Sequence, residues 1–181
     1  MATVWQASVE DLYQVKGKAE LVGGEIVSMR AASDDHNSAA GYICASLLAY
    51  VRETGVGRAY TDNAGFLCNL PNRKSFSPDA AYYTGPRGGR KFLPQAPVFA
   101  VEVRSDEDYG PAAEIRLADK RADYFAAGTE VVWDVDLLSK DVVRVYRRDE
   151  PEAPKIYRRD EVAEAEPAVP GWTISVAELF A

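Results

Sequence analysis

The chain has 181 residues, of which 47% are hydrophobic and 27% charged, and its formal net charge is −7. No apolar run approaches the roughly 20 residues that span a bilayer, and the acidic balance argues against a large, sequence-independent footprint on nucleic-acid phosphates. The length suits a single domain over residues 1–181. Cys44 and Cys68 lack a C-x-x-C spacing, and the N-terminal segment lacks a secretion signal. We therefore expect reduced thiols in a cytoplasmic protein.

The first half of the chain alternates short helices and strands. Ser8 and Asp11 have the spacing of a capping box, which predicts a short helix over residues 9–15. KAELVGGEIVSM predicts a β-hairpin that turns at its two glycines. Residues 33–55 begin with cap residues, carry apolar side chains at helical spacing and end with glycine, which predicts an amphipathic helix. GRAYTDNAGFLCNL and SPDAAYY predict strands on either side of the turn-rich PNRKS.

The second half predicts a loop, a buried strand, a helix and a closing group of strands. The loop TGPRGGRKFLPQAP is rich in glycine, proline and cations, and VFAVEVRS follows it as a strand. EIRLADKRADYFAAG predicts a helix that ends at its glycine, and EVVWDVD and KDVVRVYRR predict a strand pair. A last strand near residues 154–158 and a short helix near 175–180 complete the pattern. The order predicts an α/β fold with a mixed, curved sheet flanked by helices.

The strand VFAVEVRS carries a carboxylate, Glu102, among apolar neighbours. An unpaired buried charge is costly, so a partner or a cation should lie close to it. Asp79 follows a proline at the start of SPDAAYY, and pairing of these two strands would bring Asp79 near Glu102. Two adjacent carboxylates repel each other unless a cation lies between them, and oxygen ligands with room for water suit Mg²⁺ or Mn²⁺.

These segments, in this order, resemble the Uma-two family of restriction-type endonucleases, a branch of the PD-(D/E)XK nuclease superfamily. The resemblance runs from AELVGGEIV through SPDAAYY, VFAVEVRSDED and KRADYFAAGTEVVWDVD to PGWTISVAELF. It implies a restriction-endonuclease-like fold and Mg²⁺- or Mn²⁺-dependent hydrolysis of DNA phosphodiester bonds. It also implies a homodimer, since many nucleases of this superfamily cut two strands with paired sites.

The resemblance assigns roles to individual residues. Asp79 and Glu102 match the two metal-binding acidic residues, and Glu20 matches an additional acidic residue in the first hairpin. Lys120 matches the lysine that is displaced onto the following helix, where it would orient or activate the attacking water. His36, the only histidine, would border the active cleft and contact substrate. We therefore take Asp79, Glu102, Lys120 and Glu20 as candidate catalytic residues.

Arg104 departs from the family pattern because it stands where a strict E-x-K motif has its lysine. It could bind a substrate phosphate in a bidentate contact, or it could pair with Glu102 in place of a metal. The second possibility defines a rival function, a catalytically inactive nuclease fold that serves as a dimeric interaction or nucleic-acid-binding module. An active site should leave Arg104 pointing away from Glu102.

The candidate residues also have purely structural interpretations. Glu102 could form a buried ion pair with Arg104 or Lys120, and Asp79 could be an ordinary turn residue after proline. Glu20 could face solvent in its hairpin, and Lys120 could lie on a solvated helix face. His36 could be a cap or packing residue.

Overall fold

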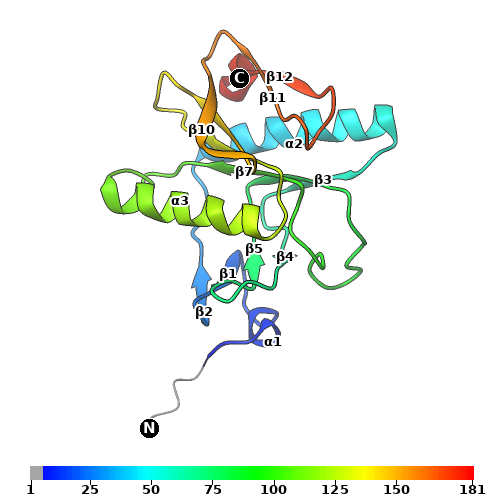
Figure 1. Cartoon of the computed structure of the whole chain (residues 1–181), viewed down its shortest axis with the longest axis vertical. Helices are drawn as coiled ribbons and strands as arrows, with labels where there is room; N and C mark the ends of the chain where they lie inside the picture. The colour runs from blue at the N-terminus through cyan, green and yellow to red at the C-terminus, as the bar shows by residue number, and fades with distance from the viewer. Residues whose placement is uncertain (1–5) are drawn as a thin grey trace.

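A computed structural model describes residues 6–181 of the chain (Figure 1). The range predicted for the domain, 1–181, includes residues 1–5, which lie outside the described residues. The helices are α1 (Val9–Leu12), α2 (Asp34–Thr54), α3 (Pro111–Ala126) and the 3₁₀ helix η1 (Val176–Phe180). The strands are β1 (Ala19–Val22), β2 (Glu25–Ser28), β3 (Arg58–Thr61), β4 (Phe66–Leu67), β5 (Ser75–Phe76), β6 (Ala80–Tyr83), β7 (Phe99–Val103), β8 (Val131–Val135), β9 (Val143–Arg147), β10 (Glu150–Tyr157), β11 (Val162–Glu164) and β12 (Thr173–Ser175).

A six-stranded sheet forms the centre of the molecule, in the order β10-β9-β8-β7-β6-β3. The β7–β8 pair is parallel and every other pair in this sheet is antiparallel. Parallel neighbours need a long crossover, and α3 supplies it by connecting the end of β7 to the start of β8. The sheet is therefore mixed, as the sequence predicts.

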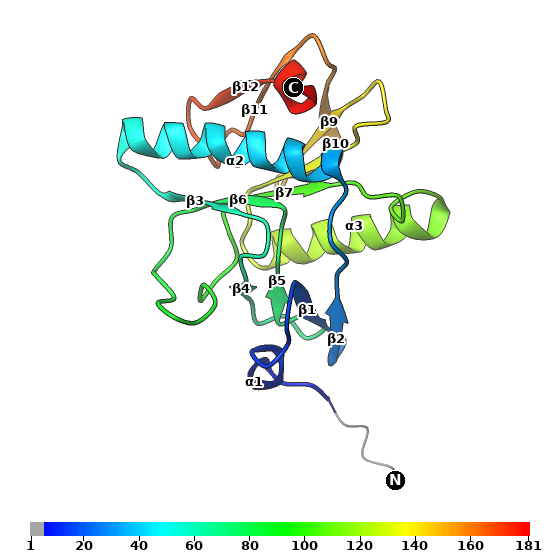
Figure 2. The same cartoon turned by 180° about the vertical axis from the view of Figure 1, so that it is seen from behind.

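The two faces of this sheet bury different clusters, because successive side chains along a strand point to opposite sides. Phe99, Val101 and Val103 of β7 pack into the larger cluster with α2 and the C-terminal segments, whereas Ala100 packs into a second cluster with Tyr124 of α3. Figures 1 and 2 show α2 with β11, β12 and η1 on one side of the sheet, and α3 with β1, β2, β4 and β5 on the other. By this alternation Glu102 faces the α3 side.

Local sequence signals account for the boundaries of several elements. The predicted capping box at Ser8 is present, since Asp11 N–H donates to the Ser8 hydroxyl and the Ser8 N–H donates to the Asp11 carboxylate. The helix that follows is shorter than predicted and ends at Leu12. The long helix α2 begins after Ser33 and ends at Gly55, whose φ of 70° is the left-handed conformation that favours glycine at a helix end.

Some elements differ from the sequence-based expectation. The segment predicted as turns before SPDAAYY contains β5, which pairs with β4, and the C-terminal region contains the separate β11–β12 pair. The predicted C-terminal helix is a 3₁₀ helix, η1. Among residues 6–181, no helix is long and apolar enough to cross a membrane.

Candidate functional site

Antiparallel pairing of β6 with β7 brings the first two candidate residues together. Ala80 pairs with Val101, so Asp79, one position before Ala80, lies opposite Glu102. The Asp79 N–H donates to the Val101 carbonyl at 2.9 Å, which continues the pairing to the start of β6. The proximity predicted from the two strand patterns is thus present in the structure.

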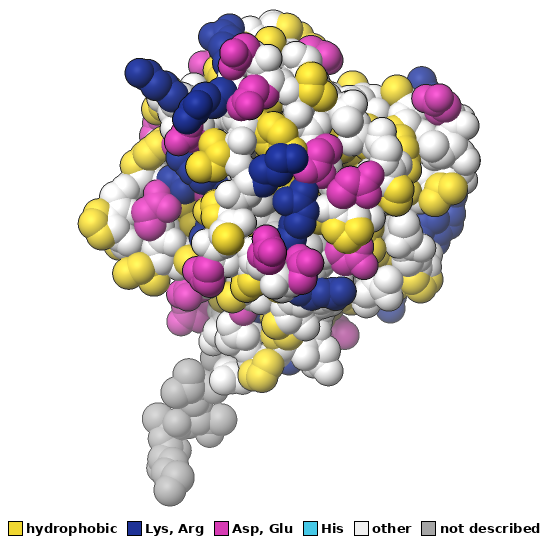
Figure 3. Space-filling model, turned by 45° about the horizontal axis from the view of Figure 1, so that its top comes forward, with side chains coloured by type: hydrophobic (Ala, Val, Ile, Leu, Met, Phe, Trp, Pro, Cys, Tyr) yellow, Lys and Arg dark blue, Asp and Glu magenta, His cyan; other side chains and the backbone are white. Residues whose placement is uncertain are grey.

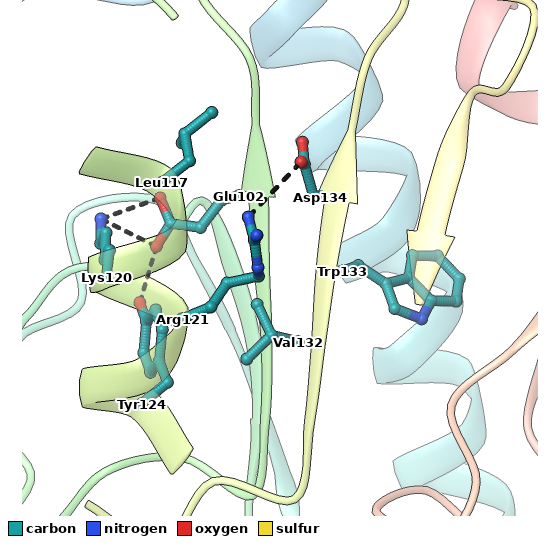
Figure 4. A pocket seen from close by; sticks show the side chains of 8 residues that line it. All are labelled: Glu102, Leu117, Lys120, Arg121, Tyr124, Val132, Trp133 and Asp134. Carbon is teal, nitrogen blue, oxygen red and sulfur yellow. Dashed lines mark hydrogen bonds and ion pairs between the residues drawn. The ribbon is translucent and has the colours of Figure 1, made fainter. Parts of the chain in front are cut away.

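Two side chains of α3 hold the Glu102 carboxylate. Lys120 Nζ lies 2.9 Å from Glu102 Oε1, and the Tyr124 hydroxyl donates to the same oxygen at 2.6 Å. Figure 4 shows both side chains reaching from the helix toward the carboxylate. Residues four apart share a helix face, so the spacing between Lys120 and Tyr124 allows both contacts.

Glu20 enters the same cluster from β1. Its Oε1 atom lies 3.0 Å from Lys120 Nζ and accepts a hydrogen bond from the Ser77 N–H at 2.8 Å. Its other oxygen accepts from Arg73, which also donates to Asp123 at 2.8 Å. The Glu20 side chain is buried, so its interpretation as a solvent-facing hairpin residue is wrong.

Asp79 is held by groups from three other parts of the chain. Lys18 Nζ lies 2.6 Å from Oδ1, the Val103 N–H donates to Oδ2 at 2.8 Å, and His36 Nε2 lies 3.3 Å from Oδ2. Lys18 also contacts the Asp62 carboxylate at 2.5 Å. His36 therefore borders the cluster, and Lys18 joins it although the sequence interpretation did not single it out.

The charges of this cluster shift the pKa values of its carboxylates in different directions. Burial raises the pKa of Glu20, but the Lys120 and Arg73 charges outweigh burial and hold it below its ordinary value. Burial likewise raises the pKa of Asp79, while His36 and Lys18 lower it to a value below the ordinary range. The pKa of Glu102 lies above its ordinary value because of burial and the nearby charges of Asp79 and Glu20, which Lys120 offsets only in part.

The two lysines of the cluster, Lys18 and Lys120, have pKa values above their ordinary ones. Burial alone would lower the pKa of Lys120, but the Glu102 and Glu20 carboxylates raise it well above its ordinary value. The pKa of Lys18 is likewise raised, by Asp79 and Glu102 against the effect of burial. Both lysines are therefore protonated at neutral pH and act as hydrogen-bond donors and cations.

Arg104 lies outside this cluster. Its guanidinium donates two hydrogen bonds to the Asp134 carboxylate, at 2.8 and 2.7 Å, and also binds Glu114 on α3. Within residues 6–181 the ion-pair partner of Glu102 is Lys120 and not Arg104. In place of the pairing with Glu102 considered from the sequence, Arg104, the residue after β7, forms ion pairs with Asp134 on β8 and Glu114 on α3.

The cluster contains the kind of donor that a divalent cation needs, because carboxylate oxygens suit Mg²⁺ and Mn²⁺. Lysine ammonium groups occupy positions between these oxygens, however. In the described part of the chain, no group of three or more His, Cys, Asp or Glu residues is arranged so that it could hold a metal ion. The donor chemistry of Asp79 and Glu102 fits such a cation, and each carboxylate binds a lysine in the structure.

Sequence reasoning missed several members of the cluster. Lys18 stands two positions before Glu20, and the alternation of side chains in a strand would have placed both on one face. Tyr124 stands one helical turn after Lys120, which was a comparable signal. Arg73 contacts Glu20 from a turn 53 positions away, and no local pattern predicts that contact.

A comparison with solved structures agrees with this fold. The six-stranded mixed sheet with helices on both faces is that of a restriction-endonuclease-like fold. The structure matches a crystal structure described as a "putative nuclease belonging to DUF820" from Anabaena variabilis, with a TM-score of 0.75 and 16% sequence identity. The match covers 96% of this chain and 97% of the other.

The family itself follows from the sequence match. Residues 7–177 match the model of the Uma2 family, described as "Putative restriction endonuclease". The chain belongs to the Uma2 family. None of the curated proteins that were compared with it matches.

Proposed function

We propose that this protein is a metal-dependent endonuclease that hydrolyses DNA phosphodiester bonds. The observation that carries the proposal is the convergence of Glu20, Asp79 and Glu102 on two mostly buried lysines on the α3 side of the central sheet. Buried, charge-shifted groups that gather in this way are characteristic of catalytic sites. Membership of a family described as "Putative restriction endonuclease" supports the same activity.

In this proposal Asp79 and Glu102 hold Mg²⁺ or Mn²⁺, and Glu20 provides further negative charge beside them. The cation, when bound, activates a water molecule as nucleophile and stabilises negative charge on the phosphate. Lys120 is protonated, so it donates hydrogen bonds to the attacking water or to a phosphate oxygen and does not act as a general base. His36 and Arg104 were both predicted to bind substrate. His36 borders the cluster, whereas Arg104 forms ion pairs with Asp134 and Glu114.

The proposal has wider parts that follow from the family resemblance. The protein would act as a homodimer in the cytoplasm, with residues 1–181 forming one nuclease domain. On the face shown in Figure 3, acidic and basic side chains are interspersed and no continuous basic band is visible. With a net charge of −7, contact with DNA should be local and weakened by salt.

The rival function is a nuclease fold without catalysis, which serves as an interaction or nucleic-acid-binding module. One observation favours it: Lys18 and Lys120 already neutralise Asp79 and Glu102. A site that uses a cation must release these contacts, at least in part, when the cation binds. The two functions therefore differ in how the protein responds to Mg²⁺ or Mn²⁺.

The deciding experiment is plasmid nicking at low salt with Mg²⁺ and with Mn²⁺. Asp79→Asn and Glu102→Gln keep the side-chain shape and remove the charge, while Asp119→Asn changes an exposed carboxylate on the same helix as Lys120. We expect metal-dependent nicking by the native protein and the Asp119 variant, and background nicking by the other two. Absence of nicking, together with no metal-induced rise in melting temperature, would establish the non-catalytic module.

A further inference from the structure

A cavity of about 240 Å³ lies beside the acidic cluster. Its wall is formed by residues of α1 and the segment after it, by the start of β1, and by loops of the central region; these include Leu12, Tyr13, Asn63, Ser77 and Phe92. The volume is far larger than one water molecule requires and is below the roughly 300–1,000 Å³ typical of sites for drug-sized ligands. A small planar group matches this size.

The wall of the cavity is continuous with the candidate catalytic site. Ser77 lines the cavity, and its N–H donates to Glu20 Oε1 at 2.8 Å. Asn63, another wall residue, follows Asp62, whose carboxylate contacts Lys18. Ser77 and Asn63 thus connect the wall of the cavity to Glu20 and, through Asp62, to Lys18.

The chemistry of the wall suits a nucleobase. Tyr13 and Phe92 present two aromatic rings, whose centroids are 4.8 Å apart with an interplanar angle of 66°. Asn63 and Ser77 add polar side chains that can pair with the edge of a base. An aromatic surface that stacks a base, together with a few polar groups at its edge, is the usual means by which proteins hold unpaired bases.

The loop that carries Phe92 also carries positive charge. Arg87, Arg90 and Lys91 are exposed, and none of them forms an ion pair within residues 6–181. These cations can contact the phosphates on either side of a base held against Phe92.

We propose that the cavity binds one unpaired nucleobase next to the phosphodiester bond at the acidic cluster, so that the substrate is single-stranded or locally unpaired nucleic acid. This inference rests on the proposed function, since it assigns the substrate class of the same site. A paired base inside a duplex cannot enter such a cavity, because its stacking and pairing must first be broken. Single strands and bases already unpaired avoid that cost.

The test compares two single strands that differ only in their bases. One is a fluorescein-labelled octathymidylate, and the other is the same sugar–phosphate length with abasic residues throughout. Binding is measured by fluorescence anisotropy at low salt in EDTA, where metal-dependent cleavage does not occur. The two cavity variants are Tyr13→Ala and Asn63→Gly. Glycine is chosen at position 63 because Asn63 has a φ of 68°, which glycine adopts without strain. The control is Tyr42→Ala, which removes an exposed aromatic side chain from α2.

We expect the native protein and the Tyr42 control to bind the strand with bases about 5- to 150-fold more tightly than the abasic strand, the range set by stacking of one base. This ratio should fall toward one in the Tyr13 variant, which loses a stacking ring, and part of the way in the Asn63 variant, which loses a polar contact to the base edge, while binding of the abasic strand stays the same. A blunt duplex of mixed sequence should bind more weakly than the single strand.

Three outcomes would overturn the inference: a ratio near one in the native protein, an unchanged ratio in both cavity variants, or no binding of either strand by a protein that melts cooperatively. A ratio that falls in the Asn63 variant alone still supports it if the Tyr13 variant fails to fold. Because the measurement needs no catalysis, base-dependent binding without nicking would contradict the proposed function and leave the cavity assignment intact. Nicking without base-dependent binding would support the proposed function and contradict the assignment of the cavity to a nucleobase.

Discussion

Lys120 Nζ lies 2.9 Å from each carboxylate oxygen of Glu102, although the two residues come from a helix and from the strand before it. Their side chains are mostly buried, with 17% and 18% of their surfaces exposed. Lys120 also reaches Glu20 at 3.0 Å, so that one ammonium group serves two carboxylates. The ammonium group of Lys120 therefore links α3 to the central sheet and to the β1–β2 hairpin.

Replacement of Lys120 by methionine should destabilise the protein strongly. The variant leaves Glu20 and Glu102 without their shared cation in a mostly buried setting, and loss of one partner from a buried pair costs roughly 3 kcal/mol or more. The free energy of unfolding in urea measures this loss. Lys140→Met, an exposed lysine between β8 and β9, is the matched control and should change stability little. A loss below about 1 kcal/mol for the Lys120 variant would show that the contact is not maintained in solution.

Lys18→Met should make stability depend on a divalent cation. In EDTA the variant leaves Asp79 and Asp62 without the ammonium group that contacts both, so its melting temperature should fall. If Asp79 helps to hold a cation, Mn²⁺ should restore stability by supplying the missing charge, and the rise in melting temperature should exceed that of the native protein. Thermal unfolding with and without Mn²⁺ measures both effects.

The outcome that contradicts this prediction is an equal response to Mn²⁺ in the two proteins. Lys18→Arg serves as the control, because it keeps the positive charge beside Asp79 and should resemble the native protein in EDTA. A variant that loses stability in EDTA but gains nothing from Mn²⁺ would indicate that Lys18 is a structural counterion at a site that binds no metal.

The sequence predicted the central elements because their signals are local and repeated. The long helix α2 has cap residues at its start, apolar side chains at helical spacing and a glycine at its end, so both boundaries could be inferred. The strand β7 alternates between two buried faces, and its single carboxylate marked it as unusual. The two-residue strands β4 and β5 are too short to show any period, which is why their pairing was missed.

The candidate site could be predicted only where its residues belong to such elements or to the family motif. Asp79, Glu102 and Lys120 were identified in this way, and the structure brings them into one cluster. The contact of Arg73 with Glu20 depends on how a turn folds against the first hairpin, and that is a tertiary property. The partner of Arg104 was left open because Asp134 aligns with Glu102 only through the parallel β7–β8 register.

Arg104→Lys should lower the stability of the protein without abolishing metal-dependent nicking at the acidic cluster. Arginine forms two hydrogen bonds with Asp134 and also binds Glu114, a geometry that lysine cannot reproduce. We expect a loss of about 1–3 kcal/mol in the free energy of unfolding. Metal-dependent nicking, if present in the native protein, should persist at temperatures where the variant is folded. Loss of nicking in a fully folded variant would return Arg104 to the substrate-binding role predicted from the sequence.

Glu164 should make stability depend on pH through contacts far from the acidic cluster. Its carboxylate accepts hydrogen bonds from the Tyr157 hydroxyl at 2.8 Å, from the Glu166 N–H at 2.6 Å and from Arg147. Burial raises the pKa of Glu164, but these donors outweigh burial and hold it below its ordinary value. A carboxylate whose pKa is lower in the folded state stabilises that state above its unfolded pKa, near 4.3, and loses this effect as the pH falls through its folded pKa.

Glu164→Gln should therefore be less stable than the native protein at pH 7, by about 1–3 kcal/mol, since it replaces a charged acceptor with a neutral one. The difference should begin to shrink as the pH falls below the unfolded pKa, near 4.3, and should be lost once the pH falls through the lower folded pKa, where the native carboxylate becomes protonated. Urea unfolding between pH 3 and pH 8 measures both proteins, with Glu152→Gln as a control for an exposed carboxylate on β10. A difference that is the same at pH 3 as at pH 7 would mean that the charge of Glu164 contributes nothing and that only its shape matters to the β9–β11 contact.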